Sequence, residues 1–238
     1  MVKNIDMTDF DKKEHVNSPE GYREIAQKLI IGLEAGYDAI KTVLSMELPK
    51  QSEILVIGGG GGKELSSLHT LSQDWKFTIL DPSKKMIKLA EYWVEHENLK
   101  ERTSLMNGYI HDFDFSASSF DAITCIAVFH YLDKSERLNI LKQVKEILKP
   151  NGIFILQLAV KPGTKEEFEY LKRIYLQYPT QNRLNNNMIS NIAETLDTEY
   201  KMLSAKEESD MIESIGFKKP VEVFSTLFFK TYVIRKMK

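Results

Sequence analysis

The sequence predicts an α/β protein with a doubly wound, mostly parallel, seven-stranded sheet, an N-terminal helical cover and a helical lid insertion. Three observations predict this fold class. Apolar runs of strand length alternate with amphipathic helical segments over residues 51–160, and five consecutive glycines follow the first run. Two further apolar runs come after a last helical segment, near residues 221–234. Alternation of strand and helix is typical of a parallel sheet with right-handed crossovers.

The composition indicates a globular chain and excludes several classes of function. Hydrophobic residues make up 42% and charged residues 28% of the 238 positions, and the formal net charge is −2. This balance gives no global attraction to nucleic acid or to an anionic membrane. The longest apolar runs reach about eight residues, whereas a membrane-spanning helix needs about 20, so no membrane partner is expected.

Cysteine usage and the first residues favour a reducing, cytoplasmic location. Cys125 is the single cysteine, so an intrachain disulfide is excluded, and its apolar surroundings predict an inert core position. Residues 1–15 are polar and acid-rich, without the apolar stretch of a secretory signal. No His, Asp or Glu spacing suggests a metal site.

The order of segments divides the chain into four parts. The pair Ser18-Pro19 has the cap-then-proline order of a helix start, and a second helix is expected over 37–46. The predicted parts are a helical cover at 1–50, a cofactor-binding core at 51–160, a helical lid at 161–205, and a helix with the last two strands, completing the core, at 206–238.

Each strand of the core is an apolar run bounded by turn residues or a helix. The run at 120–127 is apolar throughout, as in strands buried on both faces, and the helix after it carries Leu138, Leu141, Val144 and Leu148 on one side. The segment 230–238 is expected to be a solvated edge strand protected by its charges. The expected strands are 53–57, 76–80, 103–106, 120–127, 153–159, 221–224 and 227–234, the last of them antiparallel.

The glycine run occupies the place where an open parallel sheet binds its ligand, beyond the carboxyl end of the first strand. Its spacing excludes two phosphate-binding loops. A P-loop needs G-x-x-x-x-G-K-[ST], but with Gly62-Lys63 as the G-K pair the first and last positions are Ile57 and Glu64. A strict G-x-G-x-x-G fails too, because its last glycine falls on Lys63, Glu64 or Leu65. A nucleoside triphosphatase and a nicotinamide-dependent oxidoreductase are therefore disfavoured.

The run does match G-x-G-x-G, at Gly58, Gly60 and Gly62, and Asp81 ends the next strand. A carboxylate there accepts hydrogen bonds from the ribose hydroxyls of an adenosine-containing ligand. Because Asp81 also precedes Pro82, capping of the following helix is its alternative role. A cofactor without phosphate fits best, since a carboxylate in the first turn of the helix after the loop repels a pyrophosphate.

Four motifs in register resemble the class I S-adenosylmethionine (SAM) dependent methyltransferases, over about residues 22–234. They are ILVIGGGGG, LDPSKKMIKLA, NGYIHDFDFSASSFDAITCIAVFHYL and LKPNGIFIL. The sequence departs from the family pattern at Val56 and Tyr109, where many members have an acidic residue, and at Asn151, which replaces a glycine. The resemblance implies the Rossmann-like methyltransferase fold and SAM as cofactor.

The resemblance also assigns residues to that cofactor. It implies that the glycine loop passes under the methionine part, that Asp81 binds the ribose, that Met86 packs near the adenine, and that Tyr109 and Ile110 flank the adenine ring. The implied cofactor-binding residues are Tyr37, Gly58, Gly60, Asp81, Pro82, Met86, Tyr109, Ile110 and Ile126.

A narrower similarity lies in EAGYDAI, residues 34–40. It resembles a helix of the tRNA uridine-5-oxyacetic acid methyltransferases whose tyrosine, Tyr37 here, contacts the cofactor; packing in the core is the alternative role. That subgroup holds a carboxylated SAM through an arginine after the fifth strand. Neither Arg173 nor Arg183 nor Arg235 aligns with that arginine, so ordinary SAM is expected.

The sequence indicates catalytic residues less clearly than cofactor-binding residues. His130 follows the fourth strand, where the crevice opens, and is the candidate general base, although a structural histidine is equally ordinary there. Tyr170, Tyr175 and Tyr178 lie in the lid and are expected either to line the substrate site or to pack between helices.

These features predict an enzyme that moves a methyl group from SAM to an O, N or C nucleophile. A small-molecule acceptor is favoured by the balanced charge and the aromatic lid, since ligand pockets are mostly apolar. Two alternatives stay open: a tRNA-modifying methyltransferase, with nucleic acid as partner, and a non-catalytic SAM-binding subunit.

Overall fold

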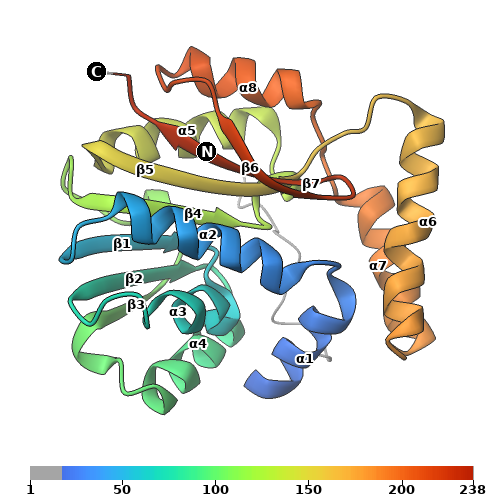
Figure 1. Ribbon diagram of the computed structural model, residues 1–238, viewed down its shortest axis with the longest axis horizontal. Coiled ribbons are helices and arrows are strands. Elements are labelled where there is room, and N and C mark those ends of the chain that lie inside the picture. The colour runs from blue at the N-terminus through green and yellow to red at the C-terminus, as the bar shows by residue number, and fades with distance from the viewer. Residues whose placement is uncertain (1–17, 238) are drawn as a thin grey trace.

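The computed structural model describes residues 18–237, and these form a seven-stranded sheet with helices on both faces (Figure 1). The strand order is β3-β2-β1-β4-β5-β7-β6, in which β7 runs antiparallel to both of its neighbours and the other pairings are parallel. The predicted fold class is confirmed. The strands are β1 (Ser52–Ile57), β2 (Trp75–Asp81), β3 (Thr103–Asn107), β4 (Phe120–Ile126), β5 (Leu148–Ala159), β6 (Val221–Thr226) and β7 (Phe229–Arg235).

The helices begin at polar caps that the sequence supplies. The Ser18 hydroxyl accepts a hydrogen bond from the Gly21 N–H at the start of α1, and the Asp133 side chain caps α5. Gly216, at φ +90°, follows the end of α8 as expected. The helices are α1 (Pro19–Leu29), α2 (Leu33–Glu47), α3 (Lys63–Leu68), α4 (Lys84–His96), α5 (Lys134–Ile147), α6 (Lys165–Gln181), α7 (Asn186–Thr198) and α8 (Ala205–Ser214).

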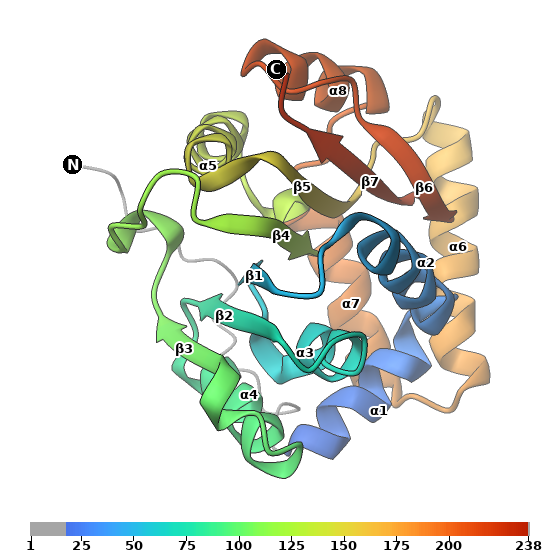
Figure 2. The same cartoon turned by 60° about the vertical axis from the view of Figure 1, so that its left-hand side comes forward.

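Both faces of the sheet are buried, which explains why the strands read as continuous apolar runs. Leu55 and Ile57 of β1 pack in one cluster with α5 and α8, whereas Ile54 and Val56 pack in a second cluster with α2 and α3. Figure 2 shows these two helical layers on opposite sides of the sheet. Alternate residues of a single strand therefore stabilise two separate cores.

Two features of the sheet differ from expectation. The hairpin of β6 and β7 folds back so that β7 lies between β5 and β6, and β6 forms the edge of the sheet. The expectation of an edge strand near the C-terminus, in the segment that contains most of β7, was therefore wrong. In addition, β5 begins at Leu148, which was expected to end the preceding helix. The register of the β4–β5 pair shifts from Phe120↔Leu148 to Ala122↔Ile153. The turn Pro150-Asn151-Gly152 therefore forms an irregularity within this strand pair.

The strand order reverses between β1 and β4, which are neighbours although β1 connects to β2. This is the switch point where open α/β sheets bind ligands, beyond the carboxyl ends of the strands. In Figure 1, α6 and α7 stand at that end of the sheet, beside α1. The structure thus places three helices from the expected cover and lid beside the carboxyl ends of the strands.

The helices α6 and α7 make their own small apolar cluster with the sheet. Tyr175 and Leu196 from these helices pack on Phe228 and Phe229, which begin β7, and on Leu29 at the end of α1. Residues 1–17 of the predicted cover lie outside the described residues. Within residues 18–237 no helix has the length and apolar character needed to cross a membrane.

Candidate active site

The glycine loop turns tightly between the ends of β1, β2 and β4. Gly58 has φ +70°, and its N–H donates to the Leu80 carbonyl at 2.7 Å. A Cβ on Gly58 would lie 2.3 Å from Cγ2 of Val128, which follows β4. The backbone can pass through this gap only without a side chain.

Gly60, Asp81 and Met86 come together at the centre of the loop. The Gly60 N–H donates to Oδ2 of Asp81 at 3.0 Å, and Oδ1 accepts from the Ser83 N–H at 2.9 Å. A Cβ on Gly60 would lie 2.5 Å from both Asp81 Oδ2 and Met86 Cβ. The carboxylate is therefore held against the loop by backbone donors. The cap of α4 is Ser83, whose hydroxyl accepts the Met86 N–H at 3.1 Å, so Asp81 does not have the capping role that was its alternative.

The end of β3 forms the next wall. Asn107 Nδ2 donates to the carbonyls of Asp81 and Pro82, at 3.0 and 2.9 Å, and so fixes the turn after β2. Tyr109 is half-buried and stacks on the His111 ring, with centroids 5.3 Å apart. Ile110 is buried in the cluster that contains Leu80 and Cys125. The structure thus brings Pro82 and Tyr109 to the same strand ends as the loop, and places Ile110 beneath them.

Tyr37 reaches the loop from α2, and its hydroxyl bonds to a carboxylate that the sequence analysis treated only as repulsive. Its partner is Glu64, in the first turn of α3 and 5% exposed. Burial, with a smaller contribution from the Asp81 charge, raises the pKa of Glu64 to about 7, although the hydrogen bond from Tyr37 acts in the opposite direction. No sequence motif signals Glu64, because its burial comes from α1 and α2 covering the loop.

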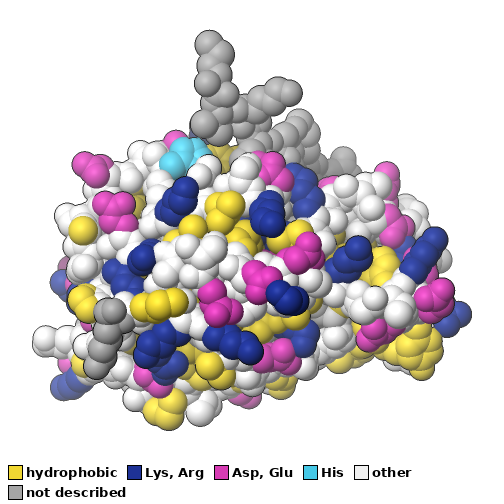
Figure 3. All heavy atoms as spheres, turned by 90° about the horizontal axis from the view of Figure 1, so that it is seen from above, with side chains coloured by type: hydrophobic (Ala, Val, Ile, Leu, Met, Phe, Trp, Pro, Cys, Tyr) yellow, Lys and Arg dark blue, Asp and Glu magenta, His cyan; other side chains and the backbone are white. Residues whose placement is uncertain are grey.

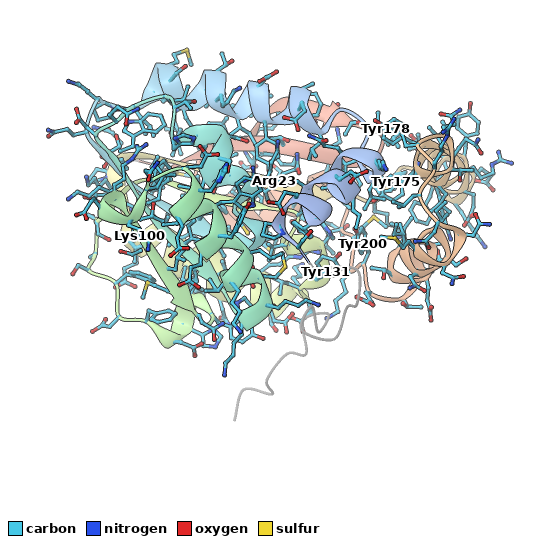
Figure 4. The ribbon with its side chains drawn as sticks, turned by 90° about the horizontal axis from the view of Figure 1, so that it is seen from below. Arg23, Lys100, Tyr131, Tyr175, Tyr178 and Tyr200 are labelled. Carbon is cyan, nitrogen blue, oxygen red and sulfur yellow. The ribbon has the colours of Figure 1, made fainter. Side chains whose placement is uncertain are left out.

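The loop is also covered by α1. A Cβ on Gly61 would lie 2.4 Å from Cε1 of Tyr22, so this ring rests directly on the loop. Arg23 donates to the Gly62 carbonyl at 3.2 Å, and its guanidinium lies 3.1 Å above the Trp93 ring (Figure 4). Sequence reasoning missed Tyr22 because its contact is purely tertiary.

His130 does not have the accessibility that a general base requires. Its side chain is 0% exposed, and Nδ1 accepts the Ala159 N–H at 3.1 Å. Burial lowers its pKa to about 3, with a smaller contribution from the positive charge of Arg137. The ring is therefore neutral and weakly basic at physiological pH, which favours a structural role. Ile126, also expected at this crevice, ends β4 and is 9% exposed.

Tyrosines line the boundary between the sheet and the lid helices. Tyr131 and Tyr200 lie at right angles with centroids 5.0 Å apart and share a hydrogen bond, and Tyr175 is buried nearby against Phe228 (Figure 4). Burial raises the pKa of Tyr131 to about 12, so its hydroxyl stays protonated at neutral pH. Tyr175 was an expected lid aromatic, whereas Tyr131 and Tyr200 were missed.

Comparison with known proteins supports the family resemblance. Residues 54–152 match a family model described as a methyltransferase domain, a span that contains the glycine loop, Asp81 and β4. The predicted recognition of class I SAM-dependent methyltransferases, whose cofactor is SAM, is confirmed.

The similar proteins extend beyond the matched domain. The chain is 22% identical to the carboxy-S-adenosyl-L-methionine synthase of Staphylococcus epidermidis over 83% of its length and 84% of the relative. It is 26% identical to the demethylmenaquinone methyltransferase of Thermotoga maritima, over 66% and 65%. A solved structure from Methanococcus maripaludis, described as a SAM-dependent methyltransferase, superposes with a TM-score of 0.62 at 19% identity, covering 95% and 96%, which supports the fold.

Replacing Gly60 by alanine tests whether the glycine loop belongs to the cofactor site. The new Cβ would lie 2.5 Å from Asp81 Oδ2 and Met86 Cβ, so the loop or the carboxylate must move. We expect at least a ~10-fold loss of SAM affinity in calorimetric titration, the size of one lost charge-assisted hydrogen bond. Gly163→Ala is the control, because its Cβ meets only the mobile end of Glu167, at 3.2 Å. Unchanged affinity in Gly60→Ala would remove the loop from the cofactor site.

Proposed function

We propose that this chain binds SAM in the crevice above β1, β2 and β4 and transfers its methyl group to an O, N or C nucleophile of a small molecule. The observation that carries the proposal is the Gly60–Asp81–Met86 arrangement, in which a carboxylate is fixed by two backbone N–H groups beside a loop without side chains. This arrangement suits a ribose that donates two hydroxyl hydrogens to Asp81 and an adenine that packs near Met86.

The residues of the chain bind and orient rather than form covalent intermediates. When bound, SAM supplies an electrophilic methyl group on a positively charged sulfur. Asp81, the glycine loop and the β3 end would hold the nucleoside, while Tyr22 and α1 cover the loop and exclude water. Such positioning supplies most of the acceleration in bimolecular transfers. His130 is buried and has a lowered pKa, so the acceptor is expected to arrive with an available lone pair or to lose its proton to water.

The small-molecule acceptor is supported by the boundary between sheet and lid. Tyr131, Tyr175 and Tyr200 gather there from η5 (Phe129–Tyr131), α6 and the end of the lid. Protonated phenol groups on apolar rings suit an organic acceptor with one or two polar groups. A tRNA acceptor is less well supported, because basic and acidic side chains are interspersed on the face shown in Figure 3.

The proposal is tested by calorimetric titration with SAM, S-adenosylhomocysteine and NADH. We expect the first two to bind with micromolar affinity and NADH not to bind. Asp81→Ala should weaken both adenosyl ligands about 100-fold or more, because two hydrogen bonds to a charged group are lost. Asp74→Ala, an exposed residue just before the opposite end of β2, is the matched control and should bind like the parent.

The outcomes separate the rival functions. Binding of NADH without either adenosyl ligand would contradict the proposal and reassign the loop to an irregular dinucleotide site. Binding of SAM without formation of S-adenosylhomocysteine, across a panel of acceptors, would indicate a non-catalytic SAM-binding subunit. Transfer to a small organic acceptor would support the proposal in full.

A second candidate function follows from the relatives named carboxy-S-adenosyl-L-methionine synthase, which fit the narrower similarity around Tyr37. Against it, Arg235 is paired with Glu47 at 2.5 Å, and the Arg173 guanidinium lies 5.6 Å from the Tyr170 ring, which is 58% exposed. Both guanidinium groups thus contact side chains of the protein itself, and neither stands ready for the extra carboxylate of a carboxylated SAM. The mass of the adenosyl compound carried by the purified protein distinguishes ordinary from carboxylated SAM.

A further inference from the structure

We propose that a groove between the lid helix α6 and the turn joining α1 to α2 is a binding site for a small aromatic carboxylate. The groove has a volume of about 370 Å³, which is in the range of sites for small organic molecules. Its walls contain no residue of the glycine loop, and neither Asp81 nor Met86. The inference therefore goes beyond the proposed function and does not depend on it.

The groove uses one face of α6, while another face of the same helix packs on the sheet. The groove residues of α6 recur at steps of one, three and four between Tyr170 and Gln181, which places them on one side of the helix. Leu171 and Tyr175 instead pack in the apolar cluster at the start of β7. Figures 1 and 2 both show α6 beside the turn from which Ile31 completes the groove. A ligand there would contact the lid and the helical cover together.

Arg173 gives the groove a positive charge that no carboxylate of its walls neutralises. The preceding residue, Lys172, is paired with Asp197 of α7, whereas Arg173 has no ion pair within residues 18–237. The Arg173 guanidinium lies 5.6 Å from the centre of the Tyr170 ring, which is 58% exposed. An aromatic neighbour does not neutralise a guanidinium, whose N–H donors fit the two oxygens of a carboxylate. The charge of the groove therefore selects an organic anion.

The remaining side chains of the groove suit a flat apolar body. Ile31 and Ile174 are half-buried and provide aliphatic contacts, and Tyr178, also half-buried, adds a second ring. Aromatic ligands pack on aliphatic side chains and stack on phenol rings. Gln177 and Gln181 lie about one helical turn apart, and their amides supply further donors for ligand oxygens. A carboxylate beside the guanidinium and a ring against the isoleucines together define an aromatic acid.

This assignment also explains two lid tyrosines that the proposed cofactor site does not use. Tyr170 and Tyr178 were expected either to line a substrate site or to pack between helices. Both line the groove, whereas Tyr175 is buried against Phe228. The carboxylate that the groove fits does not belong to a SAM derivative, because the glycine loop does not reach it.

The test is ligand-observed NMR with 2-naphthoate, which has both a ring and a carboxylate. Two matched probes are 2-naphthamide, which lacks the charge, and acetate, which lacks the ring. We expect 2-naphthoate to bind with a dissociation constant of about 1 mM, the affinity that the usual binding energy per atom gives for a ligand of this size. Both other probes should bind at least about tenfold more weakly.

Arg173→Gln should weaken the binding of 2-naphthoate about tenfold, because the charge-assisted contact is lost. Arg173 is exposed, so the unfolding curve of the variant should match that of the parent. Lys165→Gln removes an exposed cation at the start of the same helix, outside the groove. This matched control should bind 2-naphthoate like the parent.

Each other outcome overturns the inference. Absence of 2-naphthoate binding would remove the site, and equal binding by Arg173→Gln would remove the guanidinium from it. Equal affinity for 2-naphthamide would make the groove a site for apolar rings without selection for charge. Displacement of 2-naphthoate by SAM would place the acid in the cofactor crevice instead. Failure of SAM itself to bind would contradict the proposed function alone, since the comparison at Arg173 does not involve SAM.

Discussion

Replacing Arg137 by alanine should lower the free energy of unfolding by about 3–5 kcal/mol, the usual cost of removing one partner from a buried ion pair. Arg137 is 0% exposed and pairs with Glu208 of α8. Its Nε donates to the Leu132 carbonyl at 3.0 Å, and another guanidinium nitrogen donates to the Lys201 carbonyl. The Arg137 side chain therefore connects α5, α8 and the segment that follows α7. Chemical denaturation followed by circular dichroism measures the loss.

Two further variants identify the cause of that loss. In Arg137→Met with Glu208→Leu, both charges are replaced by apolar groups, so much of the stability should return, because no buried carboxylate is left without its partner. Lys206→Ala breaks the exposed pair with Asp210 in the same region and should change stability by less than ~1 kcal/mol. A loss below ~1 kcal/mol in Arg137→Ala would show that the pair does not hold these elements together.

Glu64→Gln should stabilise the protein at alkaline pH. The folded state raises the pKa of Glu64 from 4.5 to about 7. Its stabilising contribution is therefore complete below pH 4.5 and is lost as pH rises toward 7, because the unfolded chain releases the proton first. The shift corresponds to at most about 3 kcal/mol at pH 8. Glutamine cannot ionise and still accepts a hydrogen bond from Tyr37.

The measurement is the difference in unfolding free energy between Glu64→Gln and the parent at pH 4.5 and pH 8. We expect a difference near zero at the lower pH and a gain for the variant at the higher pH. Glu166→Gln, which changes an exposed glutamate in the first turn of α6, should follow the parent at both pH values. A variant less stable than the parent at pH 8 would contradict a raised pKa.

Much of the fold was predictable because its signals are local. Each buried strand is a continuous apolar run, and the glycine spacing with Asp81 at the next strand end predicted a site that the structure assembles through the Gly60 N–H bond to Asp81. The strand limits at β1 to β4 were correct within one residue. Prediction failed where the signal depends on partners distant in sequence. The insertion of β7 between β5 and β6 is an example, because charge at the chain end does not report sheet order.

The candidate site shows the same division. The glycine loop and Asp81 were predicted from spacing, because a close backbone approach and a strand-end carboxylate are encoded by neighbouring residues, whereas Met86 was implied by the family resemblance. Glu64 and Tyr22 were not predicted as site residues, because their contacts with the loop arise when α1 and α2 fold over it. His130 follows β4 as predicted, but its burial under Tyr200 and Phe229 could not be read from the sequence.

The sequence by itself determined the α/β class, the position of the glycine loop at the strand ends and the family resemblance, because hydrophobic periodicity and glycine spacing are properties of short segments. Only the tertiary structure decided which polar side chains are desolvated. Desolvation depends on atoms contributed by several elements at once, and it sets the pKa values of Glu64 and His130 in opposite directions. Burial thus makes Glu64 a proton-binding group near neutrality and makes His130 a neutral packing residue.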